Sequence, residues 1–220
     1  MQAGDGGCLS DIGTHAFHLA CFVSGLKPKA ILADLKHFVE GRNVYDNAHI
    51  LLRFSGGAKG MLWVSQVAPG NENGLRLRIY GSKAGLEWSQ ENPNYLKLST
   101  LGESPQILGR GSANLSSAAT KMTRIPSGHP EGYIEGFANI YKEIAQAVYA
   151  SRKGKSFPKG VLFPDLEDGV AVMEFIDAAL KSNQKITING FYLKENENYL
   201  FAWREIYPPK HLSALRILKS

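Results

Sequence analysis

The sequence predicts an α+β domain in which a large, mostly antiparallel open sheet has helices packed on one face. Short segments of alternating apolar and polar residues follow one another between residues 30 and 99, with turn-like connections between them. A segment of helical periodicity precedes these strands, and two more follow them. Strands joined by such short connections are expected to pair antiparallel, because a parallel crossover needs about a dozen residues or more.

The first element is a helix expected over residues 12–23. Ser10 and Asp11 offer a cap at its start, and Gly25 followed by Pro28 ends it. Its apolar residues recur at helical spacing and form one stripe: Ile12, Ala16, Leu19, Ala20 and Val23. This pattern is typical of a helix that packs one face on a core.

Six strands are expected next, over residues 30–38, 48–54, 60–67, 75–80, 85–89 and 95–99. The fourth shows the alternation clearly. Leu75, Leu77 and Ile79 share one of its faces, and the other face carries Arg76, Arg78 and Tyr80. The apolar face is expected to be buried against helices. The polar and aromatic face is expected to serve self-association.

An irregular stretch over residues 102–128 leads to a helix expected over residues 130–151, with Pro130 in its first turn. Its apolar stripe consists of Phe137, Ile140, Tyr141, Ile144 and Val148. A second helix is expected from about 166 to 181, with inward-facing Val170, Met173, Ile176, Ala179 and Leu180.

A short strand over residues 186–188 is predicted to close the domain, which is expected to span residues 1–189. The remaining residues, 190–220, differ in composition and form an atypical C-terminal tail. This tail is too aromatic for a typical disordered segment. Three interpretations of this tail remain open: it covers a sheet edge, it packs on a partner, or it is read-through sequence.

Composition and charge limit the classes of partner. Hydrophobic residues make up 44% and charged residues 20% of the 220, which suits a globular protein with a sizeable core. No apolar run approaches the roughly 20 residues that span a bilayer. The formal net charge is +5, but lysines and arginines are scattered, and the basic group at 152–155 follows a predicted helix, where cations complement the helix dipole. We expect no nucleic-acid partner and no membrane partner. Two cysteines, Cys8 and Cys21, cannot build a disulfide framework, which indicates a reducing cytoplasm.

A small group of polar residues at the first helix is the sharpest chemical pattern. Asp11 and His15 are four residues apart, so on a helix they share a face, which His18 continues. A carboxylate beside an imidazole raises its basicity and fixes its orientation. Histidine titrates near the pH at which a hydroxyl proton is taken up or returned. A helix cap with solvent-facing polar residues is the alternative interpretation of the spacing.

No nucleotide-phosphate cradle can be assigned from the sequence. The glycines of residues 4–7 have no strand before them and the wrong spacing for the dinucleotide-binding fingerprint. The chain also lacks a Walker-type loop.

Several segments, in the same order, resemble the glucose-fructose oxidoreductase and inositol dehydrogenase (Gfo/Idh/MocA) family. Residues 6–15, Gly-Gly-Cys-Leu-Ser-Asp-Ile-Gly-Thr-His, resemble the glycine-led D-x-G-x-H signature of its C-terminal domain. Further similar segments are 58–66, 68–75, 80–88, 127–133, 137–141 and 163–169. The resemblance covers roughly residues 4–188, and it implies the substrate-binding and oligomerisation domain of an NAD- or NADP-dependent sugar or polyol oxidoreductase.

The resemblance also implies roles for individual residues. His15 matches the family histidine that exchanges a proton with the substrate hydroxyl, and Asp11 matches its acidic partner. His18 stands where many members have an acidic or amide residue, so a substrate contact and a structural role remain open. His129, just before a helix, and Tyr133, one turn on, are candidate substrate contacts. The alternative interpretation of Tyr133 is a half-buried aromatic residue on an amphipathic helix.

Family members carry a Rossmann domain and a catalytic lysine before the segment that begins here near residue 4. The chain alone is therefore expected to bind neither NAD nor NADP and to be inactive. Three interpretations remain open: a truncated oxidoreductase, a non-enzymatic oligomerisation or ligand-binding module, and one half of a split enzyme with a separate Rossmann-domain chain. Self-association into a dimer or tetramer is expected through the sheet face.

Overall fold

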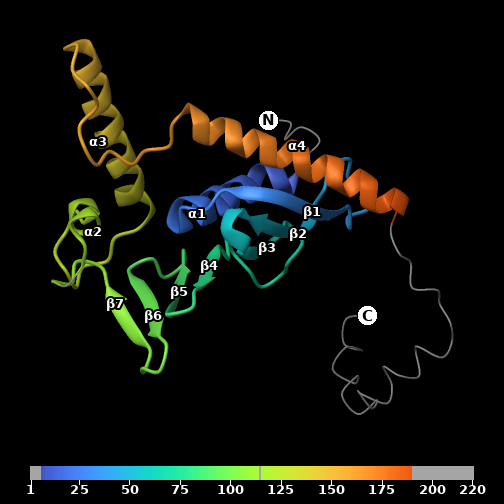
Figure 1. Ribbon diagram of the computed structural model, residues 1–220, viewed down its shortest axis with the longest axis horizontal. Coiled ribbons are helices and arrows are strands. Elements are labelled where there is room, and N and C mark those ends of the chain that lie inside the picture. Colours follow the sequence, from blue (N-terminus) through green and yellow to red (C-terminus); the bar gives the residue numbers. More distant parts are fainter. Residues whose placement is uncertain (1–5, 114, 190–220) are drawn as a thin grey trace. The chain divides into compact units, whose positions relative to one another are not determined.

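The computed structural model describes residues 6–113 and 115–189. The chain divides into two units, Met1–Gln184 and Lys185–Ser220. The elements, in chain order, are η2 (Leu9–Gly13), α1 (Thr14–Ser24), β1 (Pro28–Lys36), β2 (Asn47–Phe54), η3 (Ser55–Gly57), β3 (Lys59–Ser65), β4 (Arg76–Tyr80), β5 (Ala84–Ser89), β6 (Tyr95–Thr100), β7 (Gln106–Gly109), α2 (Ser117–Met122), α3 (Tyr133–Arg152) and α4 (Leu166–Asn189) (Figure 1). The predicted α+β class is confirmed.

The strands form two antiparallel sheets within the described residues, ordered β1-β2-β3 and β4-β5-β6-β7. The antiparallel pairing is the one that the short turns predict. The sequence predicts one large sheet, whereas no ladder joins β3 to β4 in the described residues. The connection between these two strands is longer than a hairpin turn and contains Gly70 and Gly74, both at positive φ. It therefore does not hold the two strands in register.

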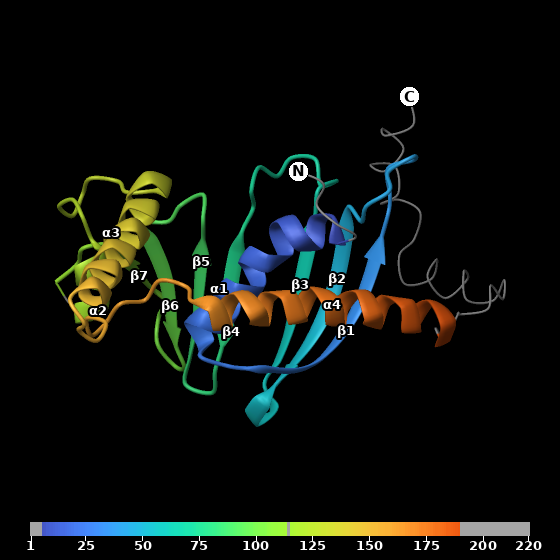
Figure 2. The ribbon, with the colours of Figure 1, turned by 90° about the horizontal axis from the view of Figure 1, so that it is seen from above.

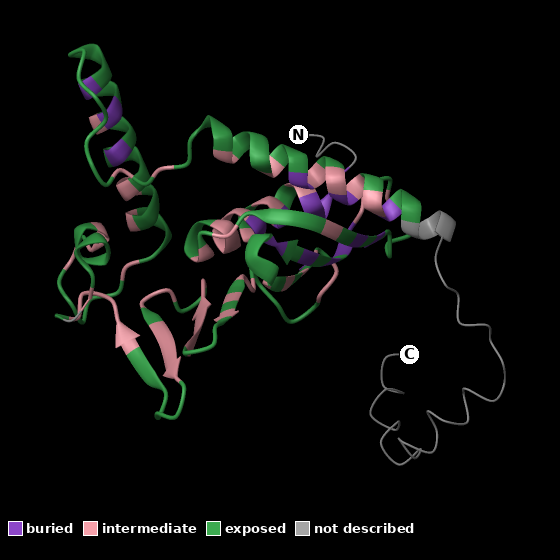
Figure 3. Cartoon of the chain, viewed as in Figure 1, coloured by how far each residue is buried: buried purple, intermediate pink, exposed green. Residues whose placement is uncertain are grey.

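The core lies on one face of the β1-β2-β3 sheet, beneath η2, α1 and α4 (Figures 2 and 3). Strand β2 alternates from Ala48 onward, and its buried apolar residues are Ala48, Ile50, Leu52 and Phe54. The helices contribute Leu9, Phe17, Phe175 and Ala179 to the same cluster. The rings of Phe17 and Phe175 stack with centroids 4.1 Å apart, which joins α1 to α4 above the sheet.

Helix α4 also covers the free edge of β1. The side chain of Asn183 accepts a hydrogen bond from the backbone N–H of Leu35 at 2.8 Å, and Ser182 Oγ accepts one from Ala33 at 3.0 Å. Both N–H groups point away from β2, so an unpaired edge would otherwise expose them to another strand. The side chains of α4 thus close this edge.

The predicted strand over residues 186–188 is wrong, because α4 continues to Asn189. Ile186, Thr187 and Ile188 have the β-branched side chains that favour strands. A strand needs a neighbouring strand for its backbone hydrogen bonds, whereas a helix makes these bonds within itself. Continuing α4 through these residues therefore satisfies their backbone groups. The prediction of which α4 residues face inward is also partly wrong. Val170 and Met173 are 50% and 63% exposed, and Phe175 lies in the core.

Two short elements lie in the stretch predicted to be irregular. Strand β7 pairs with β6, and α2 is capped by Ser116, whose Oγ accepts a hydrogen bond from the Ala119 N–H at 3.2 Å. Helix α3 begins at Tyr133 and not at the predicted Pro130. Its start is fixed by Glu135, whose carboxylate accepts a hydrogen bond from the Gly132 N–H at 2.9 Å and has a lowered pKa for this reason.

No helix among residues 6–113 and 115–189 combines the length and the apolar character that crossing a bilayer requires.

Candidate active site

Two glycines hold the start of the chain tightly against the first sheet. Gly7 has φ +51°, and a Cβ there would lie 2.1 Å from the carbonyl oxygen of Tyr45. This same oxygen accepts a hydrogen bond from the Cys8 N–H at 2.8 Å. A Cβ at Gly13 would meet Leu9 at 3.0 Å and Val64 of β3 at 3.6 Å. The glycines therefore bring η2 close to the sheet and set the direction of α1.

Asp11 lies in the π-helical turn η2, and its carboxylate is exposed. Gln66, just after β3, donates an Nε2–H to Asp11 Oδ2 at 3.1 Å. Gln66 is held in place by its own backbone, since its N–H donates to the carbonyl of Asp46 at 2.8 Å. Single-turn π-helices occur often at functional sites. The turn presents a carboxylate and an amide together at the end of β3.

His15 lies in the first turn of α1 and is exposed. In the described part of the chain, its ring makes no hydrogen bond, ion pair or ring contact. The carboxylate of Asp11 thus meets Gln66 and not the imidazole that the sequence pairs with it. The π turn explains this difference, because it changes the rotation between positions 11 and 15 from that of a regular α-helix. Both ring nitrogens of His15 are available to a ligand.

His18, one turn further along α1, has a protein partner. Its Nε2 lies 3.6 Å from Oδ1 of Asp168, and its ring lies 6.2 Å from that of Phe22. Asp168 is in the first turn of α4 and also accepts a hydrogen bond from the Asp165 N–H at 2.9 Å. Asp168 is a partner of His18 that sequence reasoning missed. The Asp165-x-x-Asp168 capping pattern could have indicated it.

The loop before α3 is organised by Arg110, another residue that sequence reasoning missed. Its guanidinium donates to Asn94 Oδ1 at 2.8 Å, to the Ile125 carbonyl at 2.9 Å and to the His129 carbonyl. It also pairs with Glu131 at 3.1 Å, and this pair is largely buried. The partners of Arg110 are 15 to 21 residues away in sequence, so no local pattern reveals them.

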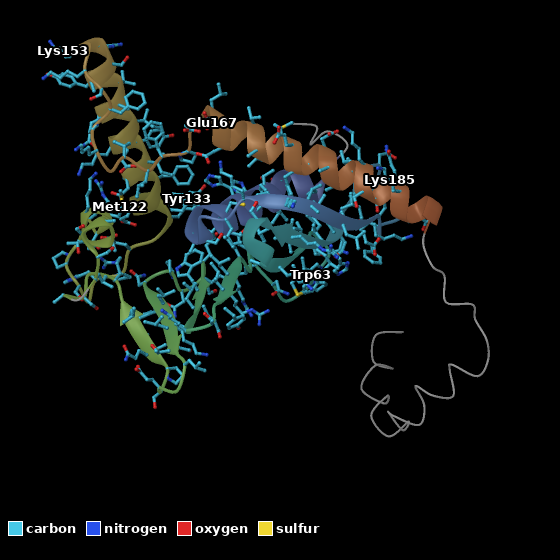
Figure 4. All side chains as sticks on the ribbon, viewed as in Figure 1. Trp63, Met122, Tyr133, Lys153, Glu167 and Lys185 are labelled. Carbon is cyan, nitrogen blue, oxygen red and sulfur yellow. The ribbon has the colours of Figure 1, made fainter. Side chains whose placement is uncertain are left out.

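His129 and Tyr133 lie at the end of this loop and the start of α3. The ring of His129 is exposed, and its backbone carbonyl is the part that Arg110 binds. Tyr133 is 77% exposed, and its ring lies 4.7 Å from that of Phe137 (Figure 4). In the described residues, no hydrogen bond or ring contact joins either side chain to Asp11, His15 or His18.

A buried carboxylate supports the sheet behind the site. Asp46 accepts hydrogen bonds from the Phe38 and Val39 N–H groups at 2.9 and 3.0 Å, and Arg42 lies 3.4 Å away. Burial by itself would raise the pKa of Asp46, but these N–H groups and the guanidinium hold it below its usual value. Arg42 is thus committed to this structural network.

The two cysteines are free thiols. Burial, reinforced by the negative charge of Asp46, raises the pKa of Cys8 to about 11. Burial also raises the pKa of Cys21, which packs half-buried against the core. Both thiols therefore stay protonated near neutral pH, where a thiolate would be needed for nucleophilic chemistry.

The described residues do not fit a nicotinamide dinucleotide. The junction from β7 to α2 carries Gly109 and Gly111, but Asn114 stands where the fingerprint has a third glycine. Arg110 between them binds the loop before α3, and α2 is six residues long. We therefore assign no nucleotide site within residues 6–113 and 115–189.

Comparisons with known proteins identify the class of domain. Residues 1–87 match the family model described as the GFO/IDH/MocA C-terminal domain. The chain is 34% identical over 183 residues to the oxidoreductase YfiI of Bacillus subtilis (strain 168), covering 82% of this chain and 47% of that protein.

Solved structures agree in fold. An oxidoreductase from Sinorhizobium meliloti is 53% identical, with a TM-score of 0.78, over 81% of this chain and 51% of that one. An inositol dehydrogenase homologue from Azotobacter vinelandii, complexed with NADH and myo-inositol, is 33% identical with a TM-score of 0.79. That match covers 83% of this chain and 49% of the other.

The fold, the order of motifs and these comparisons define a C-terminal, sheet-forming domain. Residues 1–87 carry the Gfo/Idh/MocA C-terminal domain, and the homologues of the chain are oxidoreductases of that family. It spans about half the length of the relatives that it matches.

Proposed function

We propose that the chain is the substrate-binding and oligomerisation portion of an NAD- or NADP-dependent oxidoreductase that acts on a sugar or polyol. We further propose that it is inactive without a nucleotide-binding portion. The observation that carries the proposal is the geometry of the D-x-G-x-H segment. Gly13 seats the segment against β3, which leaves His15 exposed on α1.

His15 is the proposed proton acceptor. As a hydroxyl of the substrate becomes a carbonyl, its proton passes to a ring nitrogen of His15, which has no protein partner within the described residues. A nicotinamide held by a nucleotide-binding portion would supply the hydride acceptor for the same carbon. Asp11 and Gln66 form a carboxylate–amide pair able to accept and donate hydrogen bonds to neighbouring hydroxyls.

The remaining predicted contacts have different support. His129 and Tyr133 are exposed beside the loop that Arg110 orders, which suits side chains that meet a polyol. His18 is engaged with Asp168, and this favours a role in holding α1 to α4. A substrate that reaches His18 would have to compete with Asp168.

The outer face of the β1-β2-β3 sheet is the proposed surface for self-association. Leu32, Leu51 and Met61 lie side by side across the three strands and are 50%, 56% and 77% exposed. Trp63 is 63% exposed on the same face, opposite α4 (Figure 4). An exposed apolar row on a sheet is typical of an interface between subunits. The free thiols of Cys8 and Cys21 support a cytoplasmic location.

The proposal is tested by calorimetric titration of the purified chain with NADH and NADPH. We expect no heat of binding for either nucleotide up to millimolar concentrations. Saturable binding of either one would show that the chain carries its own nucleotide site. The proposal that a separate portion binds the nucleotide would then be wrong.

A further inference from the structure

Helix α3 exposes a continuous apolar surface. We call the α3 stripe the residues Tyr133, Phe137, Ile140, Tyr141, Ile144 and Val148. Their exposed fractions range from 38% to 77%. The rings of Tyr133, Phe137 and Tyr141 follow one another along the helix, with centroids 4.7 and 6.5 Å apart. At about 1.5 Å per residue, the stripe is about 22 Å long.

The same helix buries a different side. Its buried residues are Glu143, Ala147 and Ala150. The carboxylate of Glu143 accepts a hydrogen bond from the Leu162 N–H at 2.8 Å and lies 3.9 Å from Lys121 Nζ. Figure 3 shows buried positions along one side of α3 and exposed or half-buried positions along the rest. Within the described residues, α3 therefore makes its contacts through this side, and the stripe is left uncovered.

An amphipathic helix normally turns its apolar stripe towards a core. A contiguous patch of aromatic and aliphatic side chains in water is costly, and in soluble proteins such a patch marks an interaction site. Aromatic residues are also enriched at the centres of protein interfaces. The α3 stripe has the composition of a surface that another polypeptide covers.

The comparisons indicate which polypeptide this is. The chain covers 47% to 51% of the relatives it matches, so about half of each relative lies outside the match. The stripe begins at Tyr133, four residues after His129, beside the proposed substrate contacts. A partner seated on the stripe would lie next to this loop.

We propose that the α3 stripe is the docking surface for the nucleotide-binding portion. This inference rests on the proposed function, and it names the partner and the surface that complete the same site. Self-association has a separate apolar surface, the outer sheet face with Leu32, Leu51 and Met61. The stripe is thus left for the nucleotide-binding portion.

The test uses the 220-residue chain and, as the probe, the purified half of the Sinorhizobium meliloti oxidoreductase that lies outside the match. Binding is measured by calorimetry without nucleotide or substrate. The variants are Tyr141→Glu and Val148→Glu, at positions of the stripe that are 68% and 47% exposed. Glutamate is a good helix former, so the helix should persist, and circular dichroism verifies this. The matched control is Met61→Glu on the outer sheet face.

We expect the wild-type chain and Met61→Glu to bind the probe, and both α3 variants to bind it at least about tenfold more weakly. No binding by the wild-type chain, or equal binding by folded Tyr141→Glu, would overturn the docking site. So would a wild-type oligomer that Tyr141→Glu converts to monomers, because a second copy would then cover the stripe. A complex that forms through the stripe but oxidises no polyol with NAD or NADP would leave the docking site standing and refute the proposed function.

Discussion

The imidazole Nε2 of His18 lies 3.6 Å from the carboxylate Oδ1 of Asp168, so α1 and the first turn of α4 are joined by this pair. We expect a double-mutant cycle on His18→Ala and Asp168→Ala to show a coupling free energy of a few tenths to about 1 kcal/mol, since both side chains are partly exposed. Urea unfolding of the four proteins measures it. Strictly additive effects would show that the pair contributes nothing and would return His18 to the candidate substrate contacts.

Gly7 should be far less tolerant of a side chain than Gly25. Both have positive φ, +51° and +67°, but only at Gly7 would a Cβ meet backbone, 2.1 Å from the Tyr45 oxygen. We expect Gly25→Ala to cost about 1 kcal/mol of unfolding free energy and Gly7→Ala about 3 kcal/mol or more. Chemical denaturation checks both values. Equal costs would refute the close packing of η2 on the sheet.

The buried thiol of Cys8 should make stability fall in alkali. Its pKa rises from 9.0 to about 11 in the folded protein, so the folded state keeps a proton that the unfolded chain releases. This contribution is complete below pH 9 and is lost as the pH rises towards 11. Between pH 8 and 10.5, the wild type should lose about 2 kcal/mol more unfolding free energy than Cys8→Ala. Parallel losses in the two proteins would contradict the assignment.

Self-association through the outer sheet face predicts that Met61→Glu separates the wild-type dimer or tetramer into monomers. The charge would be buried without a partner in the interface, which is costly. Met173→Glu is the matched control, because Met173 on α4 is 63% exposed and lies off the sheet. Light scattering after gel filtration gives the masses. Loss of assembly in the control alone, or in neither variant, would place the interface elsewhere.

The strands were predictable because alternation is a local signal. The alternation in β2 and β4, and the turns between the strands, set element bounds that agree with the structure to within a few residues. The helical period likewise located α1 and α3. It could not show which side of α3 is buried. That choice depends on Glu143 and the N–H of Leu162, 19 residues away.

The candidate site was predictable only in part. The D-x-G-x-H pattern located Asp11 and His15, but not the π turn, which has no sequence period of its own. The partners of these residues come from distant segments. Gln66 is 55 residues from Asp11, and Asp168 is 150 from His18. Spacing within one helix carries no information about such contacts.

The most direct measurement of the central claim is the formation of NADH in a mixture of this chain, the complementary half of the Sinorhizobium meliloti oxidoreductase, NAD and a panel of polyols that starts with myo-inositol. The account predicts NADH only when both polypeptides are present. It also predicts a rate about 10²- to 10⁴-fold lower with His15→Asn, and a much smaller loss with His18→Asn. NADH formation that His15→Asn leaves unchanged, or a stable complex that oxidises no polyol, would contradict it.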